Sequence, residues 1–242
     1  MAKSGAPSRL QGSERKDAEG TRQRLVEAAT SALRQVGFVG ASAREIARRA
    51  ECNQALVFYH FGSVANLLLA ALDETSRLRM ERYSAAVDGV TSLESLVAVA
   101  IALFREDLDS GHVTVLAELI GGSSSTPGLG SEVAARIETW TRFVEQTAVT
   151  VMEGSPFASL LDPADVAFGI VALYLGMELL THLDGERGPA ESLFASAGRL
   201  AALLGALSGA PVPAGSLGTA ERPGSRQQKP RQRKPRQRNE DV

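Results

Sequence analysis

Apolar side chains recur at steps of three and four residues along most of this chain, and no segment alternates as a strand does. This spacing gathers the apolar side chains on one face of a helix, which packs against its neighbours. We predict helices over about residues 21–36, 43–50, 54–60, 64–86, 93–108, 112–120, 131–152, 163–183 and 190–207. The pattern therefore predicts an all-α fold.

Two of these helices are short and meet across a tight break, in SAREIARRAECNQALVFYHF at residues 42–61. Ser42 and Glu45 form the S-x-x-E sequence of a capping box, in which each residue satisfies a free backbone N–H of the helix start. The helical spacing breaks after Ala50, and Asn53 is a favoured cap for the second helix. Two short capped helices around such a break are typical of a helix-turn-helix.

The second short helix has a core face and an outward face. Val57 and Phe61 lie four residues apart and are expected to face the core. The residues left on the outward side are Gln54, Ala55, Leu56, Tyr59 and His60. An outward set of this kind suits insertion into a nucleic-acid groove.

Residues 21–75 resemble the DNA-binding region of TetR-type (TetR/AcrR) transcriptional regulators. The matching positions are Gly37-Phe38, Ser42, Ile46-Ala47, Asn53, Phe58-Tyr59-His60-Phe61 and Leu67-Leu68. The resemblance implies an N-terminal three-helix helix-turn-helix DNA-binding domain. It also implies a larger C-terminal helical domain that dimerises and binds a small-molecule effector.

Three positions depart from the family pattern. Glu51 stands where Gly is common, and a left-handed residue there costs a side chain about 1 kcal/mol. Val64 replaces a frequent Lys, and Phe58 replaces a usual Tyr. Two phosphate contacts are therefore expected to be missing.

The domain organisation follows from composition as well as periodicity. Residues 1–20 and 211–242 are polar and aperiodic, so we expect a disordered N-terminal arm and a disordered basic C-terminal tail. Between them we place the helix-turn-helix domain at 21–65 and the effector-binding and dimerisation domain at 66–210.

Charge is divided unevenly along the chain. The net charge is +4 over residues 1–83, −12 over 84–221 and +6 over 222–242, and together these give the overall −2. A basic front and a basic tail suit a polyanion, and the tail can add salt-dependent DNA affinity. An inert solubilising tail is the alternative.

We expect the outward helix to read double-stranded DNA, with Gln54 on adenine and with Ala55 and Leu56 on thymine methyl groups. Contacts to phosphate are expected from Arg22, Ser42, Arg44, Tyr59 and His60. Each role has a simpler alternative. Leu56 can belong to the core, His60 can cap its helix, and Arg44 can pair with Glu45 or Glu51.

Small residues on the last two helices suggest close helix packing. We expect a homodimer interface that includes Gly169, Ala172, Gly176, Gly198, Ala201 and Gly205. The alternative is an intramolecular core rich in Ala. A dimer fits the resemblance, and a single short recognition helix reads few bases.

The effector pocket is expected to be lined by Phe104, Glu118, Trp140, Phe143, Phe168 and Tyr174. Further polar anchors considered are His112, Arg142, Glu178 and His182, although Glu178 and His182 more simply form an ion pair one helical turn apart. The aromatic residues can equally be plain core. The acidic second half suits a cationic or neutral apolar effector.

An enzyme is not expected, because the sequence has no glycine-rich phosphate loop, no G-x-S-x-G and no Cys/His cluster. The single cysteine excludes an intrachain disulfide, and we expect no apolar run to be long enough to span a membrane. We predict a cytoplasmic, dimeric repressor that binds a palindromic operator, needs no cofactor or metal, and is released by a small molecule. The alternative is a non-sensing DNA-binding or chromosome-organising protein that relies on its basic tails.

Overall fold

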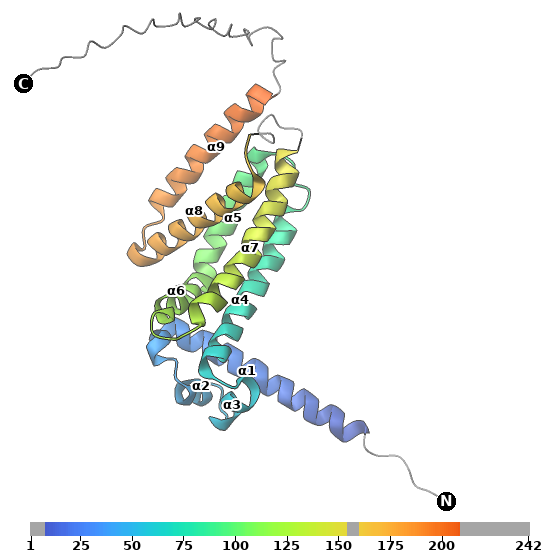
Figure 1. Cartoon of the computed structure of the whole chain (residues 1–242), viewed down its shortest axis with the longest axis vertical. Helices are drawn as coiled ribbons and strands as arrows, with labels where there is room; N and C mark the ends of the chain where they lie inside the picture. Colours follow the sequence, from blue (N-terminus) through green and yellow to red (C-terminus); the bar gives the residue numbers. More distant parts are fainter. Residues whose placement is uncertain (1–7, 154–159, 209–242) are drawn as a thin grey trace, which may run out of the picture. The chain divides into compact units, whose positions relative to one another are not determined.

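The computed structural model describes residues 8–153 and 160–208, and every regular element within them is helical (Figure 1). The helices are α1 (Ser8–Gly40), α2 (Ala43–Arg49), α3 (Ala55–Phe61), α4 (Val64–Val87), α5 (Leu93–Ser110), α6 (His112–Ser123), α7 (Leu129–Met152), α8 (Pro163–Asp184) and α9 (Gly188–Ser208). The predicted all-α fold is confirmed. The basic tail of residues 211–242 lies outside the described residues.

The first helix differs most from its prediction. α1 begins at Ser8 rather than near Thr21, so residues 8–20, expected to be disordered, are helical. Gly37 adopts φ +70°, a left-handed conformation that suits glycine, and it interrupts α1 where the helix was expected to end. The chain then makes one further turn to Gly40 before α2.

Side chains that accept from free backbone N–H groups begin several helices where the sequence predicted. The Ser63 and Ser92 hydroxyls accept from the backbone N–H groups three residues on, at 3.1 and 3.2 Å. Asp162 accepts from Ala164 N at 2.9 Å, with Pro163 at the first helical position. These caps are local signals, which explains why the boundaries agree within a few residues.

The described residues form two apolar clusters. The first joins α1–α4 to α6 and to the start of α7, and it includes Leu25, Ile46, Val57, Leu68 and Leu119. Helices α1–α4 therefore share one core with α6.

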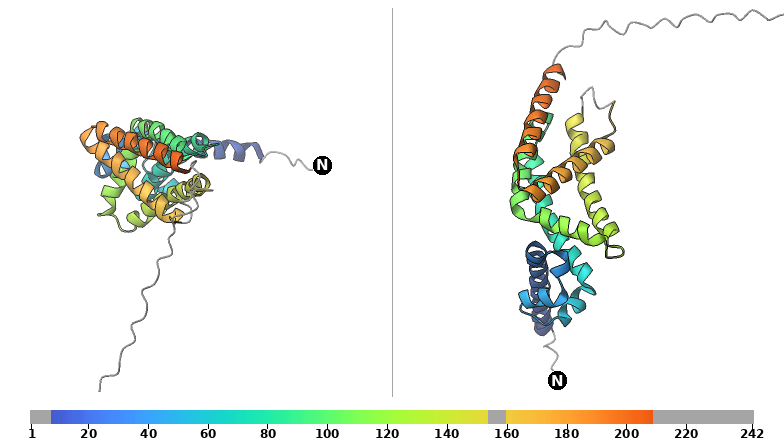
Figure 2. Two further views of the ribbon diagram at one scale, coloured as in Figure 1. Left: turned by 90° about the horizontal axis from the view of Figure 1, so that it is seen from above. Right: turned by 90° about the vertical axis from the view of Figure 1, so that its left-hand side faces the viewer.

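The second cluster lies among α4, α5, α7, α8 and α9 and is rich in aromatic residues. α4 contributes to both clusters, with Leu67–Leu69 in the first and Tyr83 in the second. Leu78, which lies between them along α4, is about half exposed. α8 packs against α7, and α9 lies along α5 (Figure 2).

α8 is the most apolar long helix, and its composition changes one expectation. At 22 residues with a mean hydropathy of 1.7 over its most apolar window, it is long and apolar enough to span a membrane, so the statement that no segment reaches that length was wrong. One such helix is weak evidence for a span, because core helices share this composition. Only 33% of that window is buried within this chain.

Candidate nucleic-acid interface and effector cavity

The start of α2 is held by Ser42, whose Oγ accepts from Glu45 N at 3.3 Å. The other half of the expected capping box is absent. The Glu45 carboxylate instead accepts from Arg48 and Arg49 at 2.7–2.9 Å, and these two guanidinium groups lower the Glu45 pKa to about 2. Arg49 also donates to Ser31 and Gln35, so α2 is fastened to α1.

The turn after α2 is a Schellman motif built around a non-glycine residue. Cys52 N donates to Ala47 O at 3.0 Å and Glu51 N donates to Arg48 O at 3.4 Å, which satisfies the free carbonyls of the helix end. Glu51 itself has φ +50°. The left-handed conformation anticipated at this position is therefore present, and a glutamate side chain bears its cost.

α3 begins with a side-chain cap from Asn53, whose Oδ1 accepts from Ala55 N at 2.8 Å. Val57 is fully buried, and Phe61 is partly buried against the first cluster, as predicted. Leu56 is also partly buried against this cluster, which favours its core role over base contact.

The outward face of α3 contains Gln54, Ala55 and Tyr59, all exposed, with Tyr59 at 79%. His60 is partly buried, and its ring packs edge-on against Tyr59 with centroids 5.0 Å apart. Phe58, which was not among the predicted contact residues, is 48% exposed and lies four residues from Gln54 on the same face. The four-residue spacing from Gln54 is the sequence signal from which the position of Phe58 could have been predicted.

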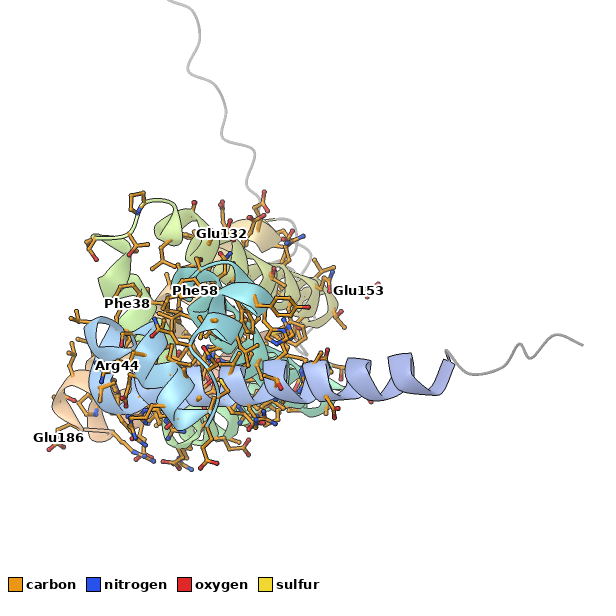
Figure 3. The ribbon with its side chains drawn as sticks, turned by 90° about the horizontal axis from the view of Figure 1, so that it is seen from below. Phe38, Arg44, Phe58, Glu132, Glu153 and Glu186 are labelled. Atoms are coloured by element: carbon orange, nitrogen blue, oxygen red, sulfur yellow. The ribbon has the colours of Figure 1, made fainter. Side chains whose placement is uncertain are left out.

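Two arginines that are candidates for phosphate contact lie near α3. Figure 3 shows the molecule from below, with Arg44 of α2 and Phe58 of α3 at this surface. Arg44 is exposed and forms no ion pair among the described residues, so neither of its expected acidic partners holds it. The Arg22 guanidinium lies 5.2 Å from the Phe61 ring centroid, which positions it beside the end of α3.

Comparison with known proteins agrees with this geometry. The family described as bacterial regulatory proteins, tetR family, matches residues 25–71, which include the whole helix-turn-helix. The HTH-type transcriptional regulator UidR of Escherichia coli K12 is 21% identical over 191 residues, covering 79% of this chain and 94% of its own. Residues 25–71 are a TetR-family DNA-binding region.

Solved structures share the fold at low identity. A TetR-family regulator from Cytophaga hutchinsonii superimposes with a TM-score of 0.65 at 18% identity, covering 77% of this chain and 95% of its own. A putative TetR-family regulator from Rhodococcus sp. has a TM-score of 0.64 at 19% identity, covering 75% and 98%. A putative regulator from Saccharomonospora viridis, solved in complex with choline, has a TM-score of 0.56 at 20% identity, covering 77% and 94%.

In the described part of the body, two cavities share Trp140 as a wall. The larger, about 260 Å³, lies among α4, α6 and α7. The smaller, about 90 Å³, lies among α4, α5, α7 and α8 and is almost wholly apolar.

The expected pocket residues fall into three groups. Trp140 lines both cavities, and Phe143 and Tyr174 line the smaller one. Phe104 is buried in the aromatic cluster, edge-on to Tyr174 at 5.5 Å. Two expectations were wrong, because Phe168 is 69% exposed and Glu118 points to α1 instead.

Glu118 connects the body to the DNA-binding helices. Its Oε2 accepts from Phe38 N at 2.7 Å, just after the break in α1 at Gly37. A Cβ on Gly122, one turn further along α6, would lie 2.5 Å from the Phe38 ring. α6 therefore fits closely against the end of α1.

Charged groups are buried beside the cavities, which the sequence analysis did not anticipate. Arg79 donates to Glu178 Oε1 at 2.9 Å, and its Nε lies 3.1 Å from Asp107 Oδ2. Asp107 also accepts from Tyr83 and Tyr174, and these five side chains are all buried. The Arg79 guanidinium lies 4.3 Å from the ring centroid of Trp140, which is buried as well. Arg82, which also donates to Asp107, is partly exposed. Burial raises the Glu178 pKa above its usual value, and the Arg79 guanidinium opposes this shift. Because Glu178 pairs with Arg79, the expected ion pair with the exposed His182 does not form.

The residues expected at a dimer interface fall into two groups, one exposed and one packed within the chain. Gly169, Ala172 and Gly205 are exposed and Gly176 is partly exposed. Ala201 is 2% exposed, and a Cβ on Gly198 would lie 3.9 Å from Val97 of α5. These last two positions therefore match the intramolecular alternative.

Proposed function

We propose that this protein is a homodimeric, sequence-specific DNA-binding repressor that acts in the cytoplasm and is released by a small molecule. The observation that carries the proposal is the exposed face of α3, on a helix fixed by the Asn53 cap and the Schellman turn before it. A rigid, capped helix with exposed Gln and Tyr suits the major groove.

In this proposal, some residues contact bases and read the DNA sequence, and others contact phosphates and position the helix. Gln54 pairs with adenine N6 and N7, while Ala55 contacts a thymine methyl. Phosphates are held by Ser42, Arg44, Arg22, Tyr59 and His60, which orient the helix without specifying sequence. Phe58 adds apolar contact beside Gln54.

Dimerisation would pair two copies of α3, and a twofold dimer of this kind would bind a palindromic operator. α8 and α9 present large exposed apolar side chains, which are Phe168, Leu173, Leu180, Leu183, Leu200 and Leu203. An exposed apolar face of this size is typical of a subunit interface. A twofold dimer then places two copies of α3 on half-sites about one or more helical turns of DNA apart.

Release would act through α4 and α6, since both helices touch the larger cavity and the DNA-binding core. Leu72 of α4 and Leu116 of α6 line the cavity and also belong to the first apolar cluster. A ligand that favours another position of either helix therefore also shifts α1–α3. The Saccharomonospora viridis protein, which has a similar fold, was solved with bound choline, and this supports the proposal that the chain binds a small molecule.

Selection of binding sites from a randomised DNA library with purified protein tests the proposal. We expect a short palindrome to be enriched. Uniform affinity for all sequences would instead favour the non-sensing alternative, which is motivated by the net +6 charge of residues 222–242. In that case deleting residues 222–242 should abolish binding at moderate salt, whereas a sequence-specific repressor keeps its palindrome and loses only part of its salt dependence.

A further inference from the structure

The larger cavity has a mostly apolar surface, although Ser76, Arg77 and Thr139 also line it. Its apolar lining is Leu72, Met80, Leu116, Ile137 and Trp140. Asp73 and Arg136, both partly or largely exposed, lie at its opening and pair with each other at 2.6 Å. Inside, the polar lining includes His112 and Arg79, which are 4% and 3% exposed.

The hydrogen bonds around His112 determine which ring nitrogen is free. The Thr75 hydroxyl donates its single hydrogen to Leu72 O at 3.1 Å. It therefore accepts from His112 Nδ1, 3.0 Å away, so the proton of the neutral ring is on Nδ1 and Nε2 is an acceptor. Burial, with the nearby Arg79 and Arg82, lowers the His112 pKa to about 3, which keeps the ring neutral.

The free acceptor of His112 is open to the cavity. Nε2 has no hydrogen bond to any described residue, and it is not among the polar atoms sealed away without a partner, which are Trp140 Nε1 and Glu178 Oε2. A ligand that donates to this acceptor forms a hydrogen bond in a low-dielectric cavity, where such a bond is stronger than in water.

Arg79 supplies the complementary donor. Its Nε faces Tyr83 and Asp107, and its Nη2 donates to Glu178. Its Nη1 has no partner among the described residues and is likewise not sealed away, while Arg79 itself lines the cavity. His112 and Arg79 therefore offer one neutral acceptor and one donor, beside the Ser76 and Thr139 hydroxyls that also line the cavity.

Charged ligands fit this lining poorly. A cation would meet Arg79 first, since Asp107 and Glu178 are engaged by Arg79 and Asp73 is engaged by Arg136. A carboxylate would meet the His112 lone pair, and the charge of Arg79 is already balanced by its own acidic partners. An uncharged group that both donates and accepts satisfies both sites.

We infer that this cavity takes an uncharged apolar molecule bearing a hydroxyl group, which donates to His112 Nε2 and accepts from Arg79 Nη1. The inference rests on the proposed function, because it names the chemical class of the releasing effector. It also narrows the earlier expectation of a cationic or neutral effector to a neutral one.

Four probes of one shape test this chemistry without DNA. They are 4-cyclohexylphenol, its methyl ether, 4-cyclohexylbenzoate and the 4-cyclohexylphenyl trimethylammonium ion. Calorimetry gives each affinity, and fluorescence of Trp140, the chain's single tryptophan, reports binding at the cavity wall. We expect the phenol to bind about tenfold more tightly than each of the other three.

Two histidine variants locate the effect. His112→Phe keeps a ring but removes the acceptor, so the preference for the phenol over the ether should fall to about one. His182→Phe changes an exposed histidine of α8 and should leave the preference intact. If His112→Phe does not fold, the ranking of the four probes by the wild-type protein still decides the matter.

Equal binding of phenol and ether, or tighter binding of either ion, would overturn the inference. A gel shift with the selected DNA, run without any probe, is the separate test of the proposed function. Selective phenol binding by a protein that fails to shift DNA would count against the repressor but not against the cavity chemistry.

Discussion

The two apolar clusters of the molecule differ in where their charged side chains lie. In the first cluster the buried residues are apolar, and the arginines of α2 lie outside it, where Arg48 and Arg49 pair with Glu45 and Arg44 stays unpaired among the described residues. In the body, Arg79, Asp107 and Glu178 are buried among aromatic rings.

This contrast separates two functions of charge. A cation needed by a polyanionic partner has to remain exposed, because a pair made within the protein competes with phosphate. A buried ion pair is at best a modest source of stability, yet it fixes one arrangement of the helices that carry it. In this protein, Arg79 connects α4 to α5 and α8, beside both cavities.

The largest effect should come from breaking the buried network. Arg79→Met leaves Glu178 buried without a partner, and we expect the free energy of unfolding to fall by about 3–5 kcal/mol in chemical denaturation at fixed protein concentration. Adding Glu178→Leu should restore most of the loss. Arg77→Met, which removes only surface pairs with Glu74 and Glu81, should cost at most about 1 kcal/mol. Equal costs for Arg79→Met and Arg77→Met would contradict the contrast.

A charge on the exposed face of α8 should affect assembly rather than folding. Leu180 is 65% exposed, and Leu180→Glu would place an unpaired carboxylate in the proposed interface. We expect the dimer dissociation constant to rise at least about a hundredfold in sedimentation velocity. Leu78→Glu, at a half-exposed position on α4, is the matched control and should leave the dimer intact. An unchanged dimer in Leu180→Glu would rule this face out.

Removing the reading side chain should weaken only specific DNA binding. Gln54→Ala deletes an adenine contact, and we expect a loss of about 1–3 kcal/mol on the selected operator, with little change on unrelated DNA. Fluorescence anisotropy on both DNAs measures this. Gln146→Ala, at an exposed position of α7, serves as control. A parallel loss on both DNAs would show that Gln54 positions the helix and does not read sequence.

The smallest effect concerns the turn between α2 and α3. Glu51→Gly relieves the left-handed conformation at φ +50°, and we expect a gain of about 1 kcal/mol in the free energy of unfolding. Glu51→Ala keeps a Cβ and should bring no such gain. Thermal unfolding of both variants gives the comparison, and equal stability of the two would mean that the turn carries no strain.

The same contrast explains what could be predicted from the sequence. The helix-turn-helix depends on signals within a few residues, such as Ser42, Asn53 and the spacing of Ile46 and Val57, and its elements lie where expected. Residues 8–20 were missed because a polar helix has no apolar stripe to reveal it.

Predictions that needed contacts between distant helices were less successful. Glu118 reaches Phe38 across eighty residues, and no local pattern indicates that bond. The buried network did leave a signal, because Arg79, Asp107 and Glu178 each occupy a position where the helical spacing calls for an apolar residue. A charged residue at a helix position where the spacing calls for an apolar one is a candidate for a buried ion pair.

The most direct test of the central claim is the ratio of affinities for the selected operator and for unrelated DNA of the same length. Competition anisotropy at physiological salt with the full chain measures it. A sequence-specific regulator predicts a ratio of at least about 10³. A ratio near one would contradict the proposal that the exposed face of α3 reads DNA sequence.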